Sequence, residues 1–290
     1  MHSIHINIED YTPLVECTSV TKESLNTEIR ATGKPIVMRN LLGHWPAVKT
    51  GRESVHSMAQ YLRHFDSAKP LQIMLGNREM AGRYFYRSDI RGYNFEHCEA
   101  PVEHILDKLL ALATDEKPIS IYAGAKSAQD LFPSFAEENP LSLLEQQINP
   151  LIWIGNNARI APHYDASENI AGVVCGKRRF LLFPPEQVEN LYVGPLENTM
   201  AGQPSSMVDP AAPDFIKCPK YQEAIKSALV AELEPGDAIY IPALWWHYVE
   251  STGPLNVLAN YWWNDVKRGC CIASLAHAVM VIRDLPLNER

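Results

Sequence analysis

The second half of the chain, from about residue 117 to residue 265, is a succession of short apolar or alternating segments separated by turn residues. Examples are LIWIG, RRFLLFPP and AIYIPALWW, and the breaks between segments include Pro184-Pro185 and Pro235-Gly236-Asp237. Alternation over a few residues is typical of a strand, and proline and glycine end strands in tight turns. This pattern constrains the fold more than any other feature, and it predicts a mainly β fold, either a many-stranded sandwich or a barrel.

Helical signals flank these strands. Thr21 is placed to cap a helix that ends before Gly33, a residue suited to the left-handed conformation beyond a helix end. The spacing of Thr50 and Glu53 resembles a capping box, which predicts that the helix over 54–65 begins there. Pro101 predicts the start of a further helix. Helices therefore flank the β region, and the first of them lie in the N-terminal third.

The chain thus divides into three regions. Residues 1–116 form a mixed helix and strand region expected to pack on the β core, 117–265 form that core, and 266–290 form a C-terminal helix. The C-terminal helix either pairs two subunits in a homodimer or covers a sheet edge. The proline-rich stretch over 191–215 is too long for a simple connection. We expect it to fold over the opening of the core, and a surface excursion is the alternative.

Composition excludes some functions. The formal net charge is −8, so the chain has no basic field for nucleic acid, and we expect no nucleic-acid partner. No run of about twenty apolar residues is present, which argues against a membrane span, and the N-terminus does not resemble a signal peptide. The six cysteines contain no CxxC pair, which favours a reducing compartment and hence a cytoplasmic location.

The segment Pro162-His163-Tyr164-Asp165 suggests a metal site. Residues two apart on a strand point to the same side, so His163 and Asp165 could share an ion. His247, 84 residues later at the predicted end of the strand after the Pro-Gly-Asp turn, is the candidate third ligand. Two imidazoles and one carboxylate leave open positions, an arrangement suited to iron(II). A His-x-Asp string alone is weak, since two polar residues on a surface strand give the same pattern, whereas His97 and His104 look incidental.

The order of these strings strengthens the metal hypothesis. LIWIG, HYD, NIAGVVCGKRRFLLFPPE, LYVGPLE, ELEPGDAIYIPALWWH and NYWW follow one another between Pro150 and Asn264, and GKPIVMRNLLGHWPA extends the match toward the N-terminus. The chain resembles the cupin-like jumonji (JmjC) oxygenases, the group that includes the asparaginyl hydroxylase of hypoxia-inducible factor. The resemblance implies a double-stranded β-helix, or jelly roll, over 117–265. It also implies iron(II) held by His163, Asp165 and His247, with 2-oxoglutarate as cosubstrate.

The distal carboxylate of 2-oxoglutarate needs a cation inside the barrel. The resembling family has a lysine fifteen residues after its first metal histidine, and Arg178 occupies that position here. A guanidinium keeps the charge and can bind a carboxylate through two hydrogen bonds. Lys177 and Arg179 should point to the other side of the strand. The alternative is that all three cations form a solvated strand start.

Four more residues carry over from the resemblance as cosubstrate contacts. Asn169 and Asn260 match asparagines that line the pocket, and as buried amides they need hydrogen-bond partners, which a dicarboxylate could supply. Tyr122 resembles a tyrosine whose hydroxyl meets the distal carboxylate, although a core tyrosine is an equal alternative. Trp262 lies two residues from Asn260 and should share its strand face.

The sequence therefore predicts an iron(II)- and 2-oxoglutarate-dependent dioxygenase, an oxidoreductase that hydroxylates a protein side chain or a small molecule while 2-oxoglutarate becomes succinate. Two alternatives stay open. A family threonine before the His-x-Asp string has no equivalent, because Ile160 and Ala161 occupy that stretch. A metal-binding cupin that acts without 2-oxoglutarate would explain this departure. A non-catalytic binding protein on the same fold is the third hypothesis.

Overall fold

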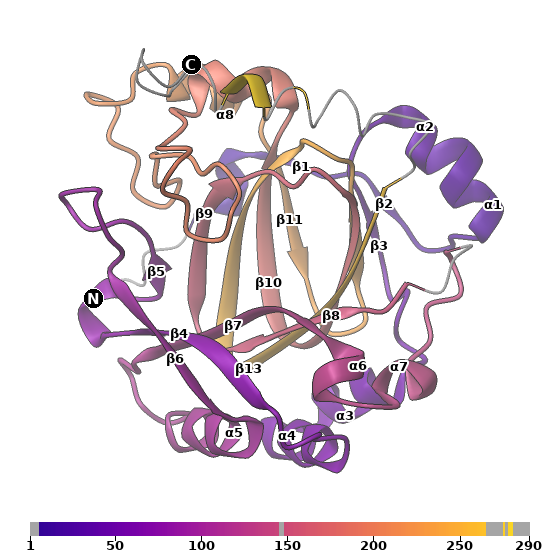
Figure 1. The fold of residues 1–290 in the computed structure, drawn as a ribbon. Helices are drawn as coiled ribbons and strands as arrows, with labels where there is room; N and C mark the ends of the chain where they lie inside the picture. Colours follow the sequence, from indigo (N-terminus) through magenta and orange to yellow (C-terminus); the bar gives the residue numbers. More distant parts are fainter. Residues whose placement is uncertain (1–5, 145–147, 265–274, 276–277, 281–290) are drawn as a thin grey trace.

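The computed structural model describes residues 6–144, 148–264, 275 and 278–280 (Figure 1). The strands are β1 (Thr12–Pro13), β2 (Glu16–Cys17), β3 (Ile36–Met38), β4 (Pro70–Gly76), β5 (Arg83–Tyr84), β6 (Phe95–Pro101), β7 (Ser120–Ser127), β8 (Leu151–Gly155), β9 (Ala158–His163), β10 (Glu168–Phe183), β11 (Leu229–Leu233), β12 (Ala238–Ile241) and β13 (Trp246–Trp263). The α-helices are α1 (Lys22–Ser24), α2 (Arg30–Thr32), α3 (Pro46–Glu53), α4 (Val55–His64), α5 (Val102–Ala111), α6 (Ala128–Leu131), α7 (Phe135–Glu138) and α8 (Tyr221–Lys226).

Two long strands, β10 and β13, pair with each other along most of their length and join two layers. In one layer the order is β2-β3-β12-β10-β13-β8-β7-β4-β6. In the other, the second half of β10 pairs with β11, and the first half of β13 pairs with β9, which pairs with β5. Strands that leave one layer and enter the next wind the sheet around a shared interior. The predicted double-stranded β-helix is confirmed.

The corner of β10 lies at Gly176, where two register shifts interrupt the pairing with β13. Gly176 has φ +78°, and a Cβ there would come within 2.3 Å of Asn256 Oδ1. β10 is nevertheless a single bent strand, because pairing with β13 continues on both sides of the corner. The bulge also changes the phase of alternation. Ala171 faces the interior before it, whereas Arg178 and Phe180 do so after it.

The helix boundaries agree with expectation except at one cap. Thr21 caps α1 through a capping box, and Gly33 ends α2 with φ +63°. Thr50, however, does not begin the second helix. It lies inside α3, and its hydroxyl donates to the carbonyl of Pro46 at 2.9 Å. Pro46 starts α3 four residues before Thr50, so Thr50 is already inside a helix. The cap of α4 is Ser54 instead.

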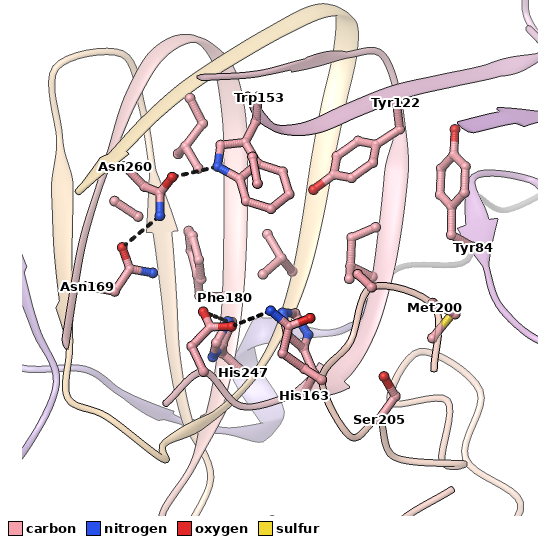
Figure 2. Close-up of a pocket in the computed structure, with 18 of the residues that line it drawn as sticks. Tyr84, Tyr122, Trp153, His163, Asn169, Phe180, Met200, Ser205, His247 and Asn260 are labelled. Atoms are coloured by element: carbon pink, nitrogen blue, oxygen red, sulfur yellow. Dashed lines mark hydrogen bonds and ion pairs between the residues drawn. The ribbon is translucent and has the colours of Figure 1, made fainter. Parts of the chain in front are cut away.

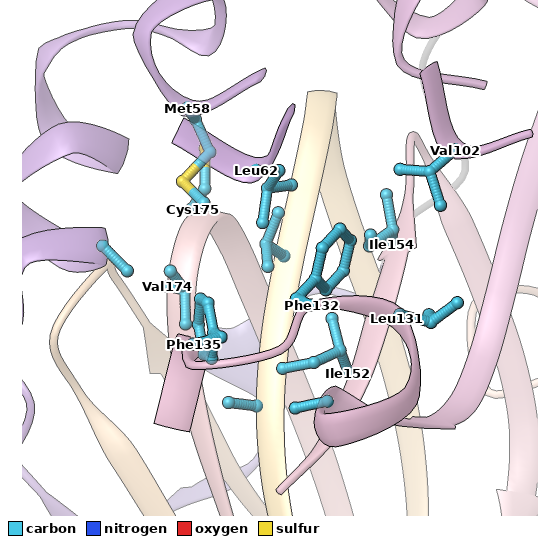
Figure 3. Packing of buried hydrophobic residues seen from close by; sticks show 14 of the residues in the cluster. Met58, Leu62, Val102, Leu131, Phe132, Phe135, Ile152, Ile154, Val174 and Cys175 are labelled. Carbon is cyan, nitrogen blue, oxygen red and sulfur yellow. The ribbon is translucent and has the colours of Figure 1, made fainter. Parts of the chain in front are cut away.

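The N-terminal region shares its hydrophobic core with the barrel. Strands β7, β4 and β6 extend one layer beyond β8, and α3, α4 and α5 lie together at one end of the molecule (Figure 1). Met58 of α4 and Val102 of α5 belong to the same buried cluster as Ile154 of β8 and Val174 of β10 (Figure 3). Phe132, which follows α6, is fully buried in that cluster. Burial of this apolar surface holds the helices against the sheet.

The far C-terminus was predicted to be helical. Leu275 and residues 278–280 are helical, but the rest of the predicted helix over 266–290 lies outside the described residues, as does the face on which the homodimer prediction depends. Within the described part of the chain, no helix is long and apolar enough to cross a membrane. The four described cysteines are unpaired, and Cys270 and Cys271 lie outside that part.

Candidate metal centre

His163, Asp165 and His247 come together at one end of the barrel interior. One ligand atom from each residue lies within 4.8 Å of the others. The centroids of the His163 and His247 rings are 4.3 Å apart, and His247 Nε2 is 3.6 Å from Asp165 Oδ2 (Figure 2). Among the residues that the structure describes, this is the only group of three or more potential metal ligands at such spacing. His97 on β6 and His104 on α5 are exposed and take no part in it.

The strands deliver these side chains differently from the sequence prediction. The sequence analysis placed His163 and Asp165 on the same side of one strand. In the structure His163 is the last residue of β9, and Asp165 lies beyond that strand. The carbonyl of Asp165 accepts a hydrogen bond from Leu244 N at 2.8 Å, which ties this turn to the approach to β13. His247 is not at the end of β12 but is the second residue of β13, directly opposite His163 in the ladder.

Both imidazoles are oriented by backbone carbonyls. His163 Nδ1 lies 2.8 Å from the carbonyl oxygen of Ala161, and His247 Nδ1 lies 3.1 Å from that of Trp245. A carbonyl only accepts, so each Nδ1 carries the proton and each Nε2 keeps its lone pair for the centre of the cluster. Burial, together with the nearby His163, lowers the pKa of His247 to about 4. The ring is therefore neutral at pH 7, the form that binds metal.

The donor set fits a resident divalent ion of the iron(II) type. Two imidazoles and one carboxylate occupy one side of the site, and none of the described cysteines joins them. Gln203 Nε2 donates to Asp165 Oδ1 at 3.2 Å. That contact leaves Oδ2, the oxygen nearest His247, as the ligand atom of the carboxylate. Open positions on the other side of such a site are what oxygen-activating iron requires.

The cluster forms part of the wall of a cavity of about 240 Å³ between the two layers. Arg178 also faces this cavity, and its side chain is only 3 % exposed. Lys177 and Arg179 point away from the cavity and pair with Glu234 and Glu232 on the outside of the barrel. The structure therefore brings Arg178, and not its neighbours, into the cavity with the metal cluster.

Arg178 is a buried cation without a counter-ion. Within the described residues no carboxylate pairs with it, and its Nε has no hydrogen-bond partner. Tyr122, a buried residue of β7, lies beside its guanidinium and lines the same cavity. Burial lowers the pKa of Arg178 and raises that of Tyr122. Because an unpaired buried charge is costly, this position fits an anionic ligand better than it fits a role in stabilising the fold.

The two predicted asparagines lie side by side on the cavity wall, next to Trp153 (Figure 2). Asn260 Nδ2 donates to Asn169 Oδ1 at 3.3 Å, and Trp153 Nε1 donates to Asn260 Oδ1 at 2.7 Å. These amides therefore find partners in each other and in Trp153. The sequence analysis expected a dicarboxylate to supply such partners, but not all of their hydrogen bonds need a ligand. Trp262 lines the cavity as predicted, and its Nε1 has no partner.

Other lining residues had no sequence signal. Met74, Tyr84 and Phe95 come from β4, β5 and β6 in the N-terminal region. Met200 and Gln203 come from the stretch over 191–215. A motif could not reveal them, because the long-range packing of these elements, rather than local spacing, brings them to the cavity.

The long loop over 191–215 packs against the barrel. Leu191 is fully buried, and Tyr86 and Tyr93 anchor the turn beyond it. Tyr86 Oη donates to the carbonyl of Asn198 at 2.5 Å, and Tyr93 Oη donates to that of Thr199 at 2.6 Å. Met200 follows this anchor directly and lies at the cavity (Figure 2). The loop thus contributes part of the cavity wall, whereas its place over the opening of the core stays a prediction.

Comparison with known proteins agrees with this geometry. The family model described as the cupin-like domain matches residues 22–269. The chain is 23 % identical over 267 residues to lysine-specific demethylase 8 of Xenopus tropicalis, covering 89 % of this chain and 54 % of that protein. It is 24 % identical over 260 residues to Jumonji C domain-containing protein 5 of Drosophila melanogaster, covering 83 % and 57 %.

A human relative is matched over more of its own length. The bifunctional peptidase and (3S)-lysyl hydroxylase JMJD7 of Homo sapiens is 24 % identical over 266 residues, which cover 80 % of this chain and 77 % of that protein. By contrast, the chain spans about half the length of the first two relatives. The match to the family model extends over most of the chain and includes every residue of the metal cluster. The chain therefore belongs to the cupin-like family of the jumonji type.

Proposed function

We propose that this protein is an iron(II)- and 2-oxoglutarate-dependent oxygenase that hydroxylates a protein side chain or a small molecule. The observation that carries the proposal is Arg178, a buried cation without a carboxylate partner in the cavity that holds the His-Asp-His cluster. A metal-only cupin would have no use for such a cation. A dicarboxylate that spans the cavity from metal to guanidinium would use both features.

Each part of the site has a role in this proposal. His163, Asp165 and His247 would hold iron(II), and Arg178 with the Tyr122 hydroxyl would bind the distal carboxylate of 2-oxoglutarate. When both are bound, iron(II) and 2-oxoglutarate would supply the oxidative chemistry, in which 2-oxoglutarate is decarboxylated to succinate and oxygen is transferred to the substrate. Apolar side chains such as Phe180 and Val249 line the remaining wall and exclude water, which strengthens the pairing of carboxylate and guanidinium.

Anaerobic titration followed by turnover tests the proposal. The protein loaded with iron(II) should bind 2-oxoglutarate and, when oxygen is admitted, should release succinate slowly without any other substrate. Protein that binds iron but neither binds nor consumes 2-oxoglutarate would indicate a metal-only cupin. Protein that binds neither would indicate a non-catalytic domain. The control is Lys177→Ala, since this residue lies outside the cavity.

The names of the relatives bear on the substrate only as a guide. Two of them are named for a demethylase and a lysyl hydroxylase. A protein side chain is therefore the substrate class to examine first, with small molecules second, and the cytoplasmic location stays a prediction.

A further inference from the structure

A short segment of the long loop, residues 203–206, runs beside the end of β9 that carries His163. Ser205 lies opposite His163 in an isolated antiparallel bridge, and the two residues are neighbours in Figure 2. Ser206 N donates to the carbonyl of Pro162 at 2.7 Å. Both serines are buried. The loop is therefore attached through its backbone to the strand that supplies the first member of the metal cluster.

The same segment is also bonded on its other side, to residues earlier in the loop. Gly194 N donates to the carbonyl of Ser205 at 2.8 Å, and Val193 and Ser206 form a second isolated bridge. Pro204 is buried, and a proline restricts the residue before it to an extended backbone. The backbone of Gln203 is thus held in place by the proline that follows it and by the bonded segment beyond.

The side chain of Gln203 is directed at the metal cluster. It lines the cavity, and its Nε2 donates to Asp165 Oδ1 at 3.2 Å. Asp165 lies beyond the end of β9, and the hydrogen bond from Leu244 N holds its backbone carbonyl rather than its side chain. Among the residues that the structure describes, Gln203 is the only hydrogen-bond donor found for this carboxylate. A residue of the loop therefore orients the carboxylate of the cluster.

From these contacts we infer that Gln203 is a positioning residue of the metal centre, which keeps Asp165 Oδ1 engaged so that the carboxylate binds the ion through Oδ2 alone. A carboxylate can bind an ion through one oxygen or through both. A second oxygen would take one of the open positions that oxygen-activating iron requires. The inference rests on the iron(II) site of the proposed function and adds to it a residue outside the His-Asp-His cluster.

Two variants and a metal titration test the inference. Gln203→Met keeps the length of the side chain and removes the donor. Gln203→Asn keeps the amide but shortens the side chain by one carbon, so that an amide now 3.2 Å from its acceptor no longer reaches it. Iron(II), and cobalt(II) as a spectroscopic substitute, are titrated anaerobically into each protein. Both variants should bind metal about 10- to 100-fold more weakly, the usual loss when the hydrogen-bond partner of a metal ligand is removed.

The absorption spectrum of bound cobalt(II) separates positioning from a general role in the loop. The spectrum depends on the number and geometry of the ligands, so at saturating metal both Gln203 variants should differ from the wild type. Tyr93→Phe is the control, because the Tyr93 hydroxyl donates to Asn198 Oδ1 and to the carbonyl of Thr199 and so holds the loop without contacting the cluster. This variant should keep the affinity and the spectrum of the wild type.

The outcomes distinguish this inference from the proposed function. Unchanged metal affinity or an unchanged cobalt(II) spectrum in the Gln203 variants would overturn the inference. So would an equal loss in Tyr93→Phe, since packing of the loop would then explain the effect. If Gln203→Met does not fold, Gln203→Asn decides. Titration with 2-oxoglutarate follows: a wild type that binds metal but not 2-oxoglutarate refutes the proposed function alone, whereas a wild type that binds no metal refutes both.

Discussion

Arg178→Ala should separate ligand affinity from stability. The guanidinium is 3 % exposed, so solvent screens its interaction with a carboxylate little. Truncating one partner of a buried charge pair costs about 2–5 kcal/mol. The dissociation constant of 2-oxoglutarate should therefore rise by about 30-fold to several thousand-fold, at one factor of ten for each 1.4 kcal/mol. Affinity for iron(II) should change little, because Arg178 is not a member of the metal cluster.

The apoprotein should respond in the opposite way. Without ligand, Arg178 is a buried charge whose Nε has no partner, and removing such a charge relieves a desolvation cost. The free energy of unfolding of apo Arg178→Ala should therefore equal or exceed that of the wild type, apart from the loss of packing along the side-chain stem. Calorimetry with 2-oxoglutarate and urea unfolding of the apoprotein measure the two effects. If Lys177→Ala abolished 2-oxoglutarate binding and Arg178→Ala left it intact, the assigned strand phase would be wrong.

Three further predictions concern the metal, the loop and the core. Alanine at any member of the His-Asp-His cluster should abolish stoichiometric iron binding in a folded protein, whereas His97→Ala should keep it; metal analysis decides, and full occupancy in a cluster variant would contradict the assignment. Replacing residues 196–202 with a Gly-Ser linker should preserve succinate formation without substrate but impair coupled hydroxylation, since this part of the loop contributes Met200 to the cavity; hydroxylation at the parent rate would exclude a substrate-reading loop. Phe132→Ala should lower the free energy of unfolding by about 3–5 kcal/mol, because the ring is fully buried, while Ile216→Ala, at a side chain 94 % exposed, should change it by less than about 0.5 kcal/mol in urea titrations.

Local patterns in the sequence were sufficient for much of the fold. Alternating apolar segments between turn residues predicted the strands, and the cap at Thr21 and the left-handed Gly33 predicted two ends of the first helical segment. These features depend on neighbouring residues, so they can be read from the chain. The same locality explains the error at Thr50. The capping-box spacing was present, but a helix that started at Pro46 already contained that residue.

Part of the candidate site could be predicted from the sequence. The types and order of the three cluster residues, together with the family resemblance, were enough to nominate them. Asp165, however, lies beyond the end of β9, and His247 lies at the start of β13 rather than at the end of the preceding strand. The position of Arg178 came from family spacing rather than from periodicity. Strict alternation from Ala171 would have turned Lys177 and Arg179 inward, and only the bulge at Gly176 reverses the phase.

The amino-acid sequence by itself determined the strand-rich core, the candidate metal ligands and the presence of a cation fifteen residues after the first histidine. Only the tertiary structure decided which side chains share the cavity. Tyr84 and Phe95 reach it from the N-terminal strands, and Met200 and Gln203 reach it from a loop that two distant tyrosines hold in place. The physical reason is that backbone alternation and capping act between neighbours, whereas the lining of a cavity depends on contacts between segments far apart in the chain.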